Sequence, residues 1–539
     1  GLNYLFHIEA EPQYQNQTGK EFSRDAAGNL LETRYDESSR ERTDYRTSFN
    51  LGYQFEKSFI QFNGLFGGDC APENKDRFIN DYVANSFTTR QERELIDRCR
   101  DNWEAGGDYE YEFNNGSKYR FLFIVNSGQY DSTRERFNIL ANREEKDLFL
   151  YSEGRDQERI FRTSYTWDPL TSHGLEMGVE RAETIRDSDL RLGMAGFGSP
   201  SLNHGNLPPI SIDNSDSIVK EMRYENFLVH NWRVSDKVSV ESSLTYETSN
   251  IKQAGDIFNK RDFDFLRPKI DYRYDITQST QLRAKIEKRV SQLSFRDFSA
   301  SSDSQDDDQN TQAGNPEIVQ EQSWEYSLNL EYRFPNNLGV FNSELYYRDI
   351  EDVIDLVNVS TSPDDLRSAR GNIGDAYRYG LRLDASTRLG FIGLPTALLN
   401  VNLSLQDSEV TDPFLGTERR LRFNSRWFGR SSFRHDITRW DLSYGLNYFN
   451  SDNDSDARMQ IDINDIEREI RDYGLSMFVE KKASNGVTFR LNVMNANDPQ
   501  RCRERTRFLG ATVNGIVEEI EDYCSSYGIQ YALNASYTF

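Results

Sequence analysis

Residues 109–125, YEYEFNNGSKYRFLFIV, carry the pattern that decides the fold. Apolar side chains occupy alternate positions on both sides of a polar centre: Tyr109, Tyr111 and Phe113, then Tyr119, Phe121, Phe123 and Val125. The centre, Asn114-Asn115-Gly116, is typical of a tight turn between two strands. Because alternate side chains of a strand point to opposite faces, the stretch predicts an antiparallel hairpin with one apolar face.

The same alternation recurs along the chain, for example in residues 2–10, 45–66 and 324–347. We count about 20 such segments of roughly 10 residues, the length at which a tilted strand crosses a bilayer. Short turns such as residues 56–57 alternate with long polar segments that we expect to form loops. These segments include residues 13–42, 67–107, 131–155, 182–216, 291–322 and 496–526.

The composition of the 539-residue chain excludes several other classes of protein. Only 36% of the residues are hydrophobic, yet 13% are aromatic, a residue type in which disordered chains are poor. The longest uncharged apolar runs fall far short of the ~20 residues that a membrane-spanning helix needs. The formal net charge of −24 argues against nucleic acid as a partner, because its phosphates need a basic surface.

We therefore predict an all-β fold, a transmembrane antiparallel β-barrel of the outer-membrane type, with long extracellular loops and short periplasmic turns. Residues 1–539 would form this single domain, with one strand face against outer-membrane lipid and lipopolysaccharide and the other against a wet lumen. The five histidines are scattered, and no zinc-protease, nucleophile-elbow or P-loop motif is present. We expect no enzymatic activity and assign no catalytic residue.

The end of the chain carries a second signal. Apolar side chains alternate up to the last residue: Ile529, Tyr531, Leu533, Ala535, Tyr537 and Phe539. The pattern resembles the C-terminal signal by which outer-membrane barrels are recognised by their assembly machinery. We assign that role to Tyr531, Leu533, Ala535, Tyr537 and Phe539.

The four cysteines predict the compartment. Cys70, Cys99, Cys502 and Cys524 lie in polar segments, and their spacing does not match a C-x-x-C zinc site. Four cysteines allow three connectivities, and proximity in the sequence favours Cys70–Cys99 and Cys502–Cys524. Disulfides indicate an oxidising compartment such as the periplasm or the cell surface. Four free thiols in a cytosolic protein are the alternative.

From residue 282 onward the sequence resembles the barrel of a TonB-dependent receptor. Asn315, Pro316, Glu317, Glu321 and Ser323 follow the mid-barrel pattern N-P-x-L-x-P-E-x-S of that family, although a glutamine stands where the second proline is usual. Residues 341–354, FNSELYYRDIEDVI, resemble a family strand and the start of its loop. The closing hairpin, residues 489–495 and 531–539, is the third similar stretch.

The resemblance implies about 22 strands around a plugged lumen. It also implies an N-terminal plug domain preceded by a short box that binds the TonB complex. Neither the plug nor the box is recognisable in residues 1–539, so we expect both, with a first hairpin, upstream of residue 1.

The function that the resemblance implies is TonB-dependent active uptake of a scarce nutrient through a gated barrel in the bacterial outer membrane. Ferric siderophore, glycan, peptide and cobalamin remain open as ligands, and the substrate-binding residues stay unassigned. The alternative is an outer-membrane barrel without transport, acting as a surface scaffold, an adhesin or a complex subunit beside a surface lipoprotein.

One acidic stretch is a weak candidate for a metal site. Asp452, Asp454 and Asp456 resemble the start of a calcium-binding loop, but Ala457 and Ile463 replace the glycine and glutamate that such a loop requires. We expect no cofactor and no metal here. Ca²⁺ bound loosely by the acidic loops is the alternative.

Two arginines are candidates for contacts in the lumen. Arg422 and Arg426 alternate with apolar residues and are expected to face the interior of the barrel. There they would either attract an anionic ligand or form salt bridges with neighbouring strands.

Overall fold

The computed structural model describes residues 1–83, 86–302, 311–362, 366–452, 458–484 and 486–537. Strands numbered β1 to β31 and six short 3-10 helices account for the regular structure of these residues. None of the described helices has the length and apolar character needed to cross a membrane.

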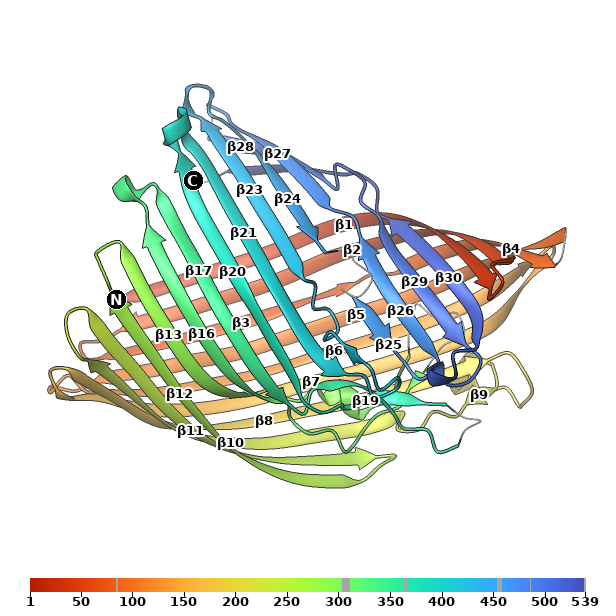
Figure 1. Cartoon of the computed structure of the whole chain (residues 1–539), viewed down its shortest axis with the longest axis horizontal. Helices are drawn as coiled ribbons and strands as arrows, with labels where there is room; N and C mark the ends of the chain where they lie inside the picture. The colour runs from red at the N-terminus through yellow and green to blue at the C-terminus, as the bar shows by residue number, and fades with distance from the viewer. Residues whose placement is uncertain (84–85, 303–310, 363–365, 453–457, 485, 538–539) are drawn as a thin grey trace.

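Consecutive antiparallel strands form the wall of a barrel, as the alternating sequence predicts. The wall strands are β1 (Leu2–Asp25), β2 (Leu30–Gln54), β3 (Ser58–Cys70), β5 (Ser86–Glu112), β6 (Lys118–Leu140), β7 (Arg143–Leu170), β8 (His173–Met194), β10 (Asp216–Arg233), β11 (Val238–Gly255), β12 (Asn259–Asp275), β13 (Thr280–Val290), β16 (Gln322–Arg333), β17 (Gly339–Glu351), β20 (Ala376–Leu389), β21 (Leu394–Thr411), β23 (Trp427–Ile437), β24 (Leu442–Ser451), β27 (Gly474–Lys482), β28 (Val487–Met494) and β31 (Gln530–Tyr537). Strands of the first half lie on one side of the interior and strands of the second half on the other (Figure 1).

Short turns join the wall strands at one end of the barrel, on the left and at the top of Figure 1. The hairpin predicted from residues 109–125 is confirmed, because β5 pairs with β6 up to Glu112 and Lys118. Gly116 adopts a φ of 80° in its turn, a conformation that costs glycine little. The short turn predicted at residues 56–57 also lies between consecutive strands, and residues 334–338 likewise separate β16 from β17.

The long polar segments were predicted as loops, and that prediction is wrong for the first three of them. β1 pairs with β2 almost without interruption from Leu2 to Arg24. β4 (Glu73–Val83) pairs with both β2 and β5, and β6 continues to Leu140 before a tight turn into β7. The segments are polar because charged side chains replace apolar ones while the strand alternation continues. These side chains form ion pairs across the strands, so polarity here does not indicate a loop.

The remaining elements lie at the end of the barrel opposite the short turns (Figure 1). The strands are β9 (Pro209–Ile210), β14 (Ser301–Ser302), β15 (Thr311–Gln312), β18 (Ile354–Asn358), β19 (Ser368–Asn372), β22 (Glu418–Arg419), β25 (Met459–Ile461), β26 (Asp465–Arg471), β29 (Arg501–Phe508) and β30 (Val517–Ser526). Of the 3-10 helices, η1 (Leu202–His204), η2 (Phe295–Phe298) and η6 (Thr512–Asn514) lie here, whereas η3 (Pro335–Asn337), η4 (Gly390–Ile392) and η5 (Thr438–Trp440) form short turns.

The segment that follows β13 folds back into the barrel. Phe295 and Phe298 of η2, with Ile318, pack against Val219 of β10 and Ile251 of β11 in a buried cluster. This described part of the predicted 291–322 loop therefore narrows the interior.

Both disulfides join residues that face each other on neighbouring strands. Cys70 of β3 lies opposite Cys99 of β5, and Cys502 of β29 lies opposite Cys524 of β30. This is the pairing that sequence proximity favours, and no free cysteine remains in the described residues. Each disulfide crosslinks a pair of strands beside the interior cavity, which Cys99 and Cys502 line.

The barrel wall has an open seam between its first and last strands. Residues 18–25 of β1 pair with β30, whereas the described residues place only β2 beside residues 2–17. On the other side of the seam, β31 pairs with β28. Tyr531 and Leu533 of β31 are highly exposed. Ala535 and Tyr537 continue the strand, but Phe539 lies outside the described residues, and the assembly signal stays a prediction.

Candidate functional site

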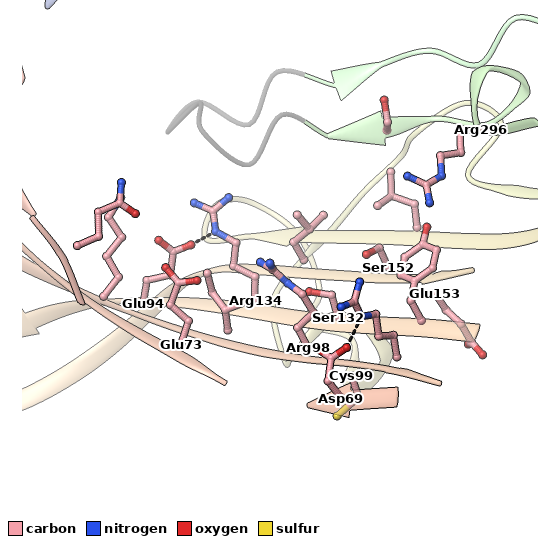
Figure 2. Close-up of a pocket in the computed structure, with 18 of the residues that line it drawn as sticks. Asp69, Glu73, Glu94, Arg98, Cys99, Ser132, Arg134, Ser152, Glu153 and Arg296 are labelled. Carbon is pink, nitrogen blue, oxygen red and sulfur yellow. Dashed lines mark hydrogen bonds and ion pairs between the residues drawn. The ribbon is translucent and has the colours of Figure 1, made fainter. Parts of the chain in front are cut away.

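The interior of the barrel contains a large polar cavity of about 1660 Å³. The wall strands β1 to β8 line one side, and β26, β29 and β30 line the other. Figure 2 shows Arg98, Arg134 and Ser152 of the first side, with Arg296 of η2 above them. Basic and acidic side chains line the cavity in nearly equal numbers, although the whole chain carries 88 acidic and only 64 basic residues. Relative to the chain, the cavity is therefore enriched in positive charge.

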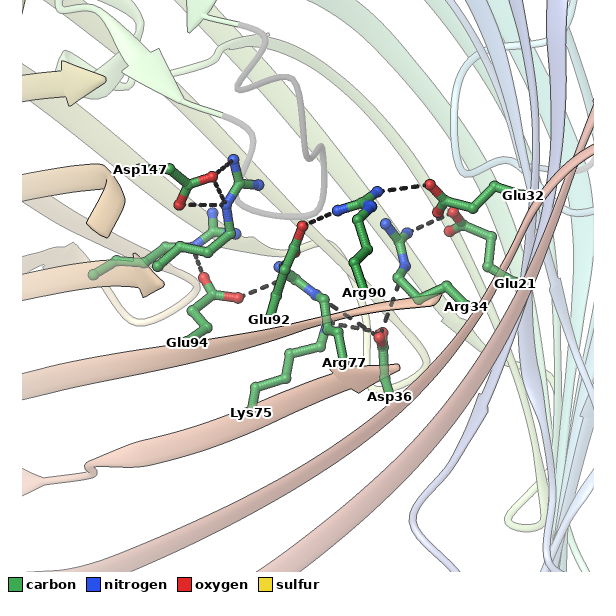
Figure 3. Close-up of polar contacts among 12 residues, drawn as sticks. Glu21, Glu32, Arg34, Asp36, Lys75, Arg77, Arg90, Glu92, Glu94 and Asp147 are labelled. Carbon is green, nitrogen blue, oxygen red and sulfur yellow. Dashed lines mark hydrogen bonds and ion pairs between the residues drawn. The ribbon is translucent and has the colours of Figure 1, made fainter. Parts of the chain in front are cut away.

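The side formed by β1 to β8 carries a network of buried ion pairs, which we call the N-terminal wall (Figure 3). Arg77 is 3% exposed, and its Nη2 lies 2.8 Å from Glu94 Oε2, while its Nη1 lies 3.5 Å from Glu92 Oε2. Arg134 forms a further ion pair with Glu94. Each buried carboxylate of the pair Glu92 and Glu94 thus faces at least one guanidinium group.

The same network continues along β1, β2 and β4. Arg34 Nη2 lies 2.5 Å from Glu21 Oε1, and Lys75 Nζ lies 2.9 Å from Asp36 Oδ2. Burial lowers the pKa of Lys75 to about 8, with Arg77 as the next cause. Buried charges are tolerated when an opposite charge and hydrogen bonds compensate them. The N-terminal wall is therefore a structural element that holds the long strands together.

The opposite side, formed by β26, β29 and β30, carries a ladder of arginines that we call the C-terminal wall. Arg501, Arg503, Arg505 and Arg507 alternate along β29, and the strand register gives each of them two neighbours. The neighbours of Arg507 are Asp465 and Glu519, and those of Arg505 are Glu467 and Glu521. At the end of the ladder nearer the cavity, the neighbours of Arg503 are Glu469 and Tyr523, and those of Arg501 are Arg471 and Ser525. The neighbouring carboxylates thus decrease toward the cavity, which Arg501 and Arg503 line.

Three arginines share one carboxylate of the C-terminal wall. Glu469 lies 2.6 Å from Arg471, 3.3 Å from Arg501 and 3.7 Å from Arg458. Burial lowers the pKa of Arg458, and the positive charge of Arg471 lowers it further. Three arginines thus share the one carboxylate of Glu469 at the surface of the cavity.

The prediction for Arg422 and Arg426 is correct for one of the two. Arg422 lines the cavity, and its guanidinium group lies 4.6 Å from the ring of Phe423. No ion pair of Arg422 is found among the described residues, and burial lowers its pKa, followed by the effect of Arg370. Arg426 is exposed and is not part of the cavity lining. Both precede β23 instead of lying in it, so strand alternation does not set their directions.

The family-motif residues form an anchor outside the cavity lining. Asn315 Nδ2 donates a 2.8 Å hydrogen bond to the carbonyl of Arg370, and the Glu317 backbone N–H donates to Asn315 Oδ1 at 2.9 Å. The carbonyl of Pro316 accepts a 2.9 Å hydrogen bond from Asn259. The motif thereby ties the segment before β16 to β12 and β19.

Glu321 and Ser323 complete the motif at the start of β16. Glu321 is half-buried, and burial raises the pKa of its carboxyl group above the ordinary value. Ser323 lies between Arg289 of β13 and Ile350 of β17 in the sheet register. Neither residue reaches the cavity.

Only one residue of the weak candidate for a metal site, Asp452, belongs to the described part of the chain. Asp452 is buried, and its Oδ2 accepts a 3.2 Å hydrogen bond from the Arg426 backbone N–H. Asp454 and Asp456 lie outside the described residues. Within the described ranges, no group of three or more metal-binding side chains comes together.

The arginines of β26 and β29 were missed by the sequence reasoning. Arg501, Arg503, Arg505 and Arg507 occupy alternate positions in RCRERTRF, which is a strand signal with four cations on one face. The signal was present, but the segment was assigned to a polar loop. Which end of the ladder meets carboxylates depends on the pairing of β29 with β26 and β30, which the local sequence does not specify.

An antiparallel wall that encloses a polar interior, has exposed apolar residues on its outer face and is open only at the seam between β1 and β31 is typical of an outer-membrane β-barrel of the receptor and transporter class. The chain matches the family model "TonB dependent receptor-like, beta-barrel" over residues 13–496. The chain therefore belongs to the TonB-dependent receptor family and lies in the bacterial outer membrane. Its family and structural neighbours are transporters and receptors and not enzymes.

Several solved structures share this fold. The copper transporter OprC has a TM-score of 0.56 and 12% sequence identity, with 95% of this chain and 80% of that chain covered. The ferric-catecholate import receptor Fiu from E. coli has a TM-score of 0.54 and 8% identity, covering 96% and 81%. The ferric yersiniabactin uptake receptor FyuA from Yersinia pestis has a TM-score of 0.53 and 11% identity, covering 97% and 80%. A search of curated proteins finds no match.

Proposed function

We propose that this chain is the barrel of a receptor that imports a small polyanionic solute across the outer membrane by TonB-dependent active transport. Family membership supports the transport class. The observation that carries the choice of solute is the arginine ladder of the C-terminal wall, in which the carboxylates directly opposite each arginine fall from two at Arg507 to none at Arg501, which lines the cavity. Carboxylate and phosphate groups are the natural partners of guanidinium groups, which bind them through paired hydrogen bonds.

The geometry supports a division of labour between the two walls. Arg501, Arg458 and Arg422 line one side of the cavity and would supply the charge that a bound anion neutralises. The compensated ion pairs of the N-terminal wall would keep the opposite side rigid. Holding the cations in place before binding reduces the entropic cost of ordering them around the ligand.

The open seam between β1 and β31 is the basis for a second proposal, which concerns the strands and the domain that complete the transporter. Backbone groups that face hydrocarbon must be hydrogen-bonded, so an open strand edge is not stable in the bilayer. We propose that two further strands pair with residues 2–17 of β1 and with β31. A plug domain that contacts the TonB complex would accompany them, because a barrel of this width needs an obstruction to be gated.

Binding of citrate, a trivalent anion, tests the proposed solute class. We expect saturable binding to the purified protein in detergent, weakening as the salt concentration rises. Charge reversal by Arg501→Glu should weaken binding by about tenfold or more, because it removes a charge-assisted contact and adds repulsion. The control is Arg333→Glu at the short-turn end of β16, which should bind citrate as the wild type does. Equal binding by wild type and Arg501→Glu would refute the anion site.

Uptake of radiolabelled citrate by cells that express the whole natural protein tests the transport step. We expect accumulation that stops when the TonB system is inactivated. Citrate binding without TonB-dependent accumulation would contradict import of this ligand and favour the scaffold or adhesin alternative.

A further inference from the structure

A cationic cluster lies on β7, β8 and β10, which are neighbours in the wall (Figure 1). Its centre is Glu183, whose carboxylate lies 2.5 Å from Lys220, 3.3 Å from Arg159 and 3.6 Å from Arg181. None of these four residues lines the cavity described above. The cluster therefore has a role separate from the proposed solute site.

Strand alternation places the cluster on the outer surface of the barrel. Arg181 and Glu183 share a face of β8 with Met177 and Val179, which are 47% and 48% exposed. The opposite face of β8 carries the buried Ala182 and Arg186, and Arg186 lines the cavity. Arg159 lies directly opposite Glu183 in the sheet and so shares its face.

The height of the cluster corresponds to the outer leaflet of the membrane. Glu183 is the tenth residue after His173, where β8 leaves its short turn. At about 3.4 Å per residue and a tilt of about 40°, it lies roughly 26 Å above the periplasmic rim, close to the ~25 Å height of the apolar band. Tyr224 and Tyr246, both exposed on the outer face just below, fit the upper aromatic girdle of such a band.

The cluster has more positive charge than its own carboxylate neutralises. The side chain of Glu183 is only 8% exposed, whereas those of Arg159, Arg181 and Lys220 are 48%, 37% and 45% exposed. Lys252 lies opposite Lys220 on the next strand, and within the described residues it forms no ion pair. Three cationic groups around one carboxylate, with a fourth beside them, give the cluster a net positive charge that attracts anions.

The other side of the barrel has the opposite charge at the same height. Asp349 is the tenth residue of β17 after Gly339, and it shares its outer face with the exposed Leu345 and Tyr347. On β21, Asp407 and Glu409 share the outer face of Leu405, and Asp407 forms a 2.9 Å ion pair with Arg420. β17 and β21 thus carry carboxylates where β7, β8 and β10 carry cations.

We propose that Arg159, Arg181 and Lys220 bind a phosphate group of the phosphorylated glycolipid of the outer leaflet, lipopolysaccharide. A phosphate monoester carries up to two negative charges, which matches the surplus around Glu183. Arginine provides paired donors that fit phosphate oxygens, and lysine adds a point charge. The buried Glu183 carboxylate positions the three cations before the lipid arrives.

Lipid binding by the whole protein in detergent, measured by native mass spectrometry, tests this site. We expect diphosphoryl lipid A to bind with one high-affinity copy and phosphatidylethanolamine to bind weakly. The double variant Arg181→Glu, Lys220→Glu should weaken lipid A binding roughly thirtyfold, the effect of losing two interfacial cations. The matched control is Arg273→Glu, Arg333→Glu, which makes the same change in net charge at the short-turn end and should bind lipid A like the wild type.

Two results would overturn the proposal. One is equal binding of lipid A with and without its phosphates, since that would assign the interaction to the acyl chains. The other is unchanged lipid A affinity in the double variant. If the charge reversals prevent assembly, the milder pair Arg181→Gln, Lys220→Gln gives the same test, and heat-modifiable gel mobility verifies that each variant forms a folded barrel.

Discussion

The two walls of the lumen use the same residue type for opposite purposes. In the N-terminal wall, Arg77 lies among Asp36, Glu92 and Glu94, and almost none of its surface reaches solvent. In the C-terminal wall, Arg471 and Arg501 share Glu469 with Arg458, which precedes β25. A guanidinium group surrounded by carboxylates stabilises the wall, whereas several around one carboxylate can bind an anion. The ratio of charges, and not the presence of arginine, distinguishes a structural wall from a binding wall.

The largest effect should come from breaking the N-terminal network. Arg77→Met leaves Glu94 and Asp36 buried with fewer compensating charges, and removing one partner of a buried ion pair costs about 3–5 kcal/mol. Thermal unfolding of the purified barrel, followed by loss of heat-modifiable gel mobility, measures this cost. Arg143→Gln is the control, because Arg143 is 70% exposed beside Glu145 and such surface pairs contribute only about 0–1 kcal/mol. Equal effects of the two substitutions would contradict the structural role of the network.

The disulfides should differ between the two walls. Loss of Cys502–Cys524 removes a crosslink worth about 2–4 kcal/mol from the short strands β29 and β30. Loss of Cys70–Cys99 should lower the local stability of β3 and β5 less, because these strands pair over all of Ser58–Cys70. The ion-pair network of the N-terminal wall also lies beside them. Hydrogen exchange of Cys502→Ser, Cys524→Ser should show faster exchange in β29 and β30, with the barrel wall intact. The ranking would be reversed if loss of Cys70–Cys99 accelerated exchange in β5 more than loss of Cys502–Cys524 accelerates exchange in β29.

A third prediction separates binding from stability. Arg501→Gln should weaken citrate binding by about tenfold, the loss of one charge-assisted contact, and change the unfolding free energy by less than about 1 kcal/mol. Arg501 is suited to this test because its side chain is 56% exposed and shares Glu469 with two other arginines. Titration calorimetry and thermal unfolding of the same sample give both values. A variant that is destabilised as strongly as Arg77→Met would assign Arg501 to the structural network.

The smallest effect should be a pH dependence at the top of the C-terminal wall. Burial raises the pKa of Asp462, between β25 and β26, from 3.8 to about 6, with Asp465 as the next cause. Because the folded protein binds this proton more tightly than the unfolded chain, stability rises as the pH falls from 7 through 6. The gain between pH 7 and pH 5 is roughly 1 kcal/mol.

The difference in unfolding temperature between wild type and Asp462→Asn isolates this contribution from the other carboxylates. The variant should lack the gain, and the two curves should approach each other at pH 5. Parallel curves across that range would show that Asp462 does not carry the effect.

Much of the fold follows from local pattern, and the site does not. Tyr109, Phe121 and Gly116 predict a hairpin because alternation and turn chemistry act over a few residues. The pairing of Cys70 with Cys99 follows from proximity in the chain. Arg422 was expected in the lumen and lies there, but the strand argument used for it is wrong, since a loop positions it. The position of Arg501 on a strand was not predicted, because a polar strand and a polar loop have similar compositions.

The sequence by itself determined the class of protein: alternation every second residue and the abundance of aromatic side chains specify strands with one face toward lipid. The tertiary structure decided which charges neutralise one another. The carboxylates that flank Arg505 come from β26 and β30, and those around Arg77 come from β2 and β5. Charge compensation depends on distances across strands, and the register of neighbouring strands, not their order in the chain, sets those distances.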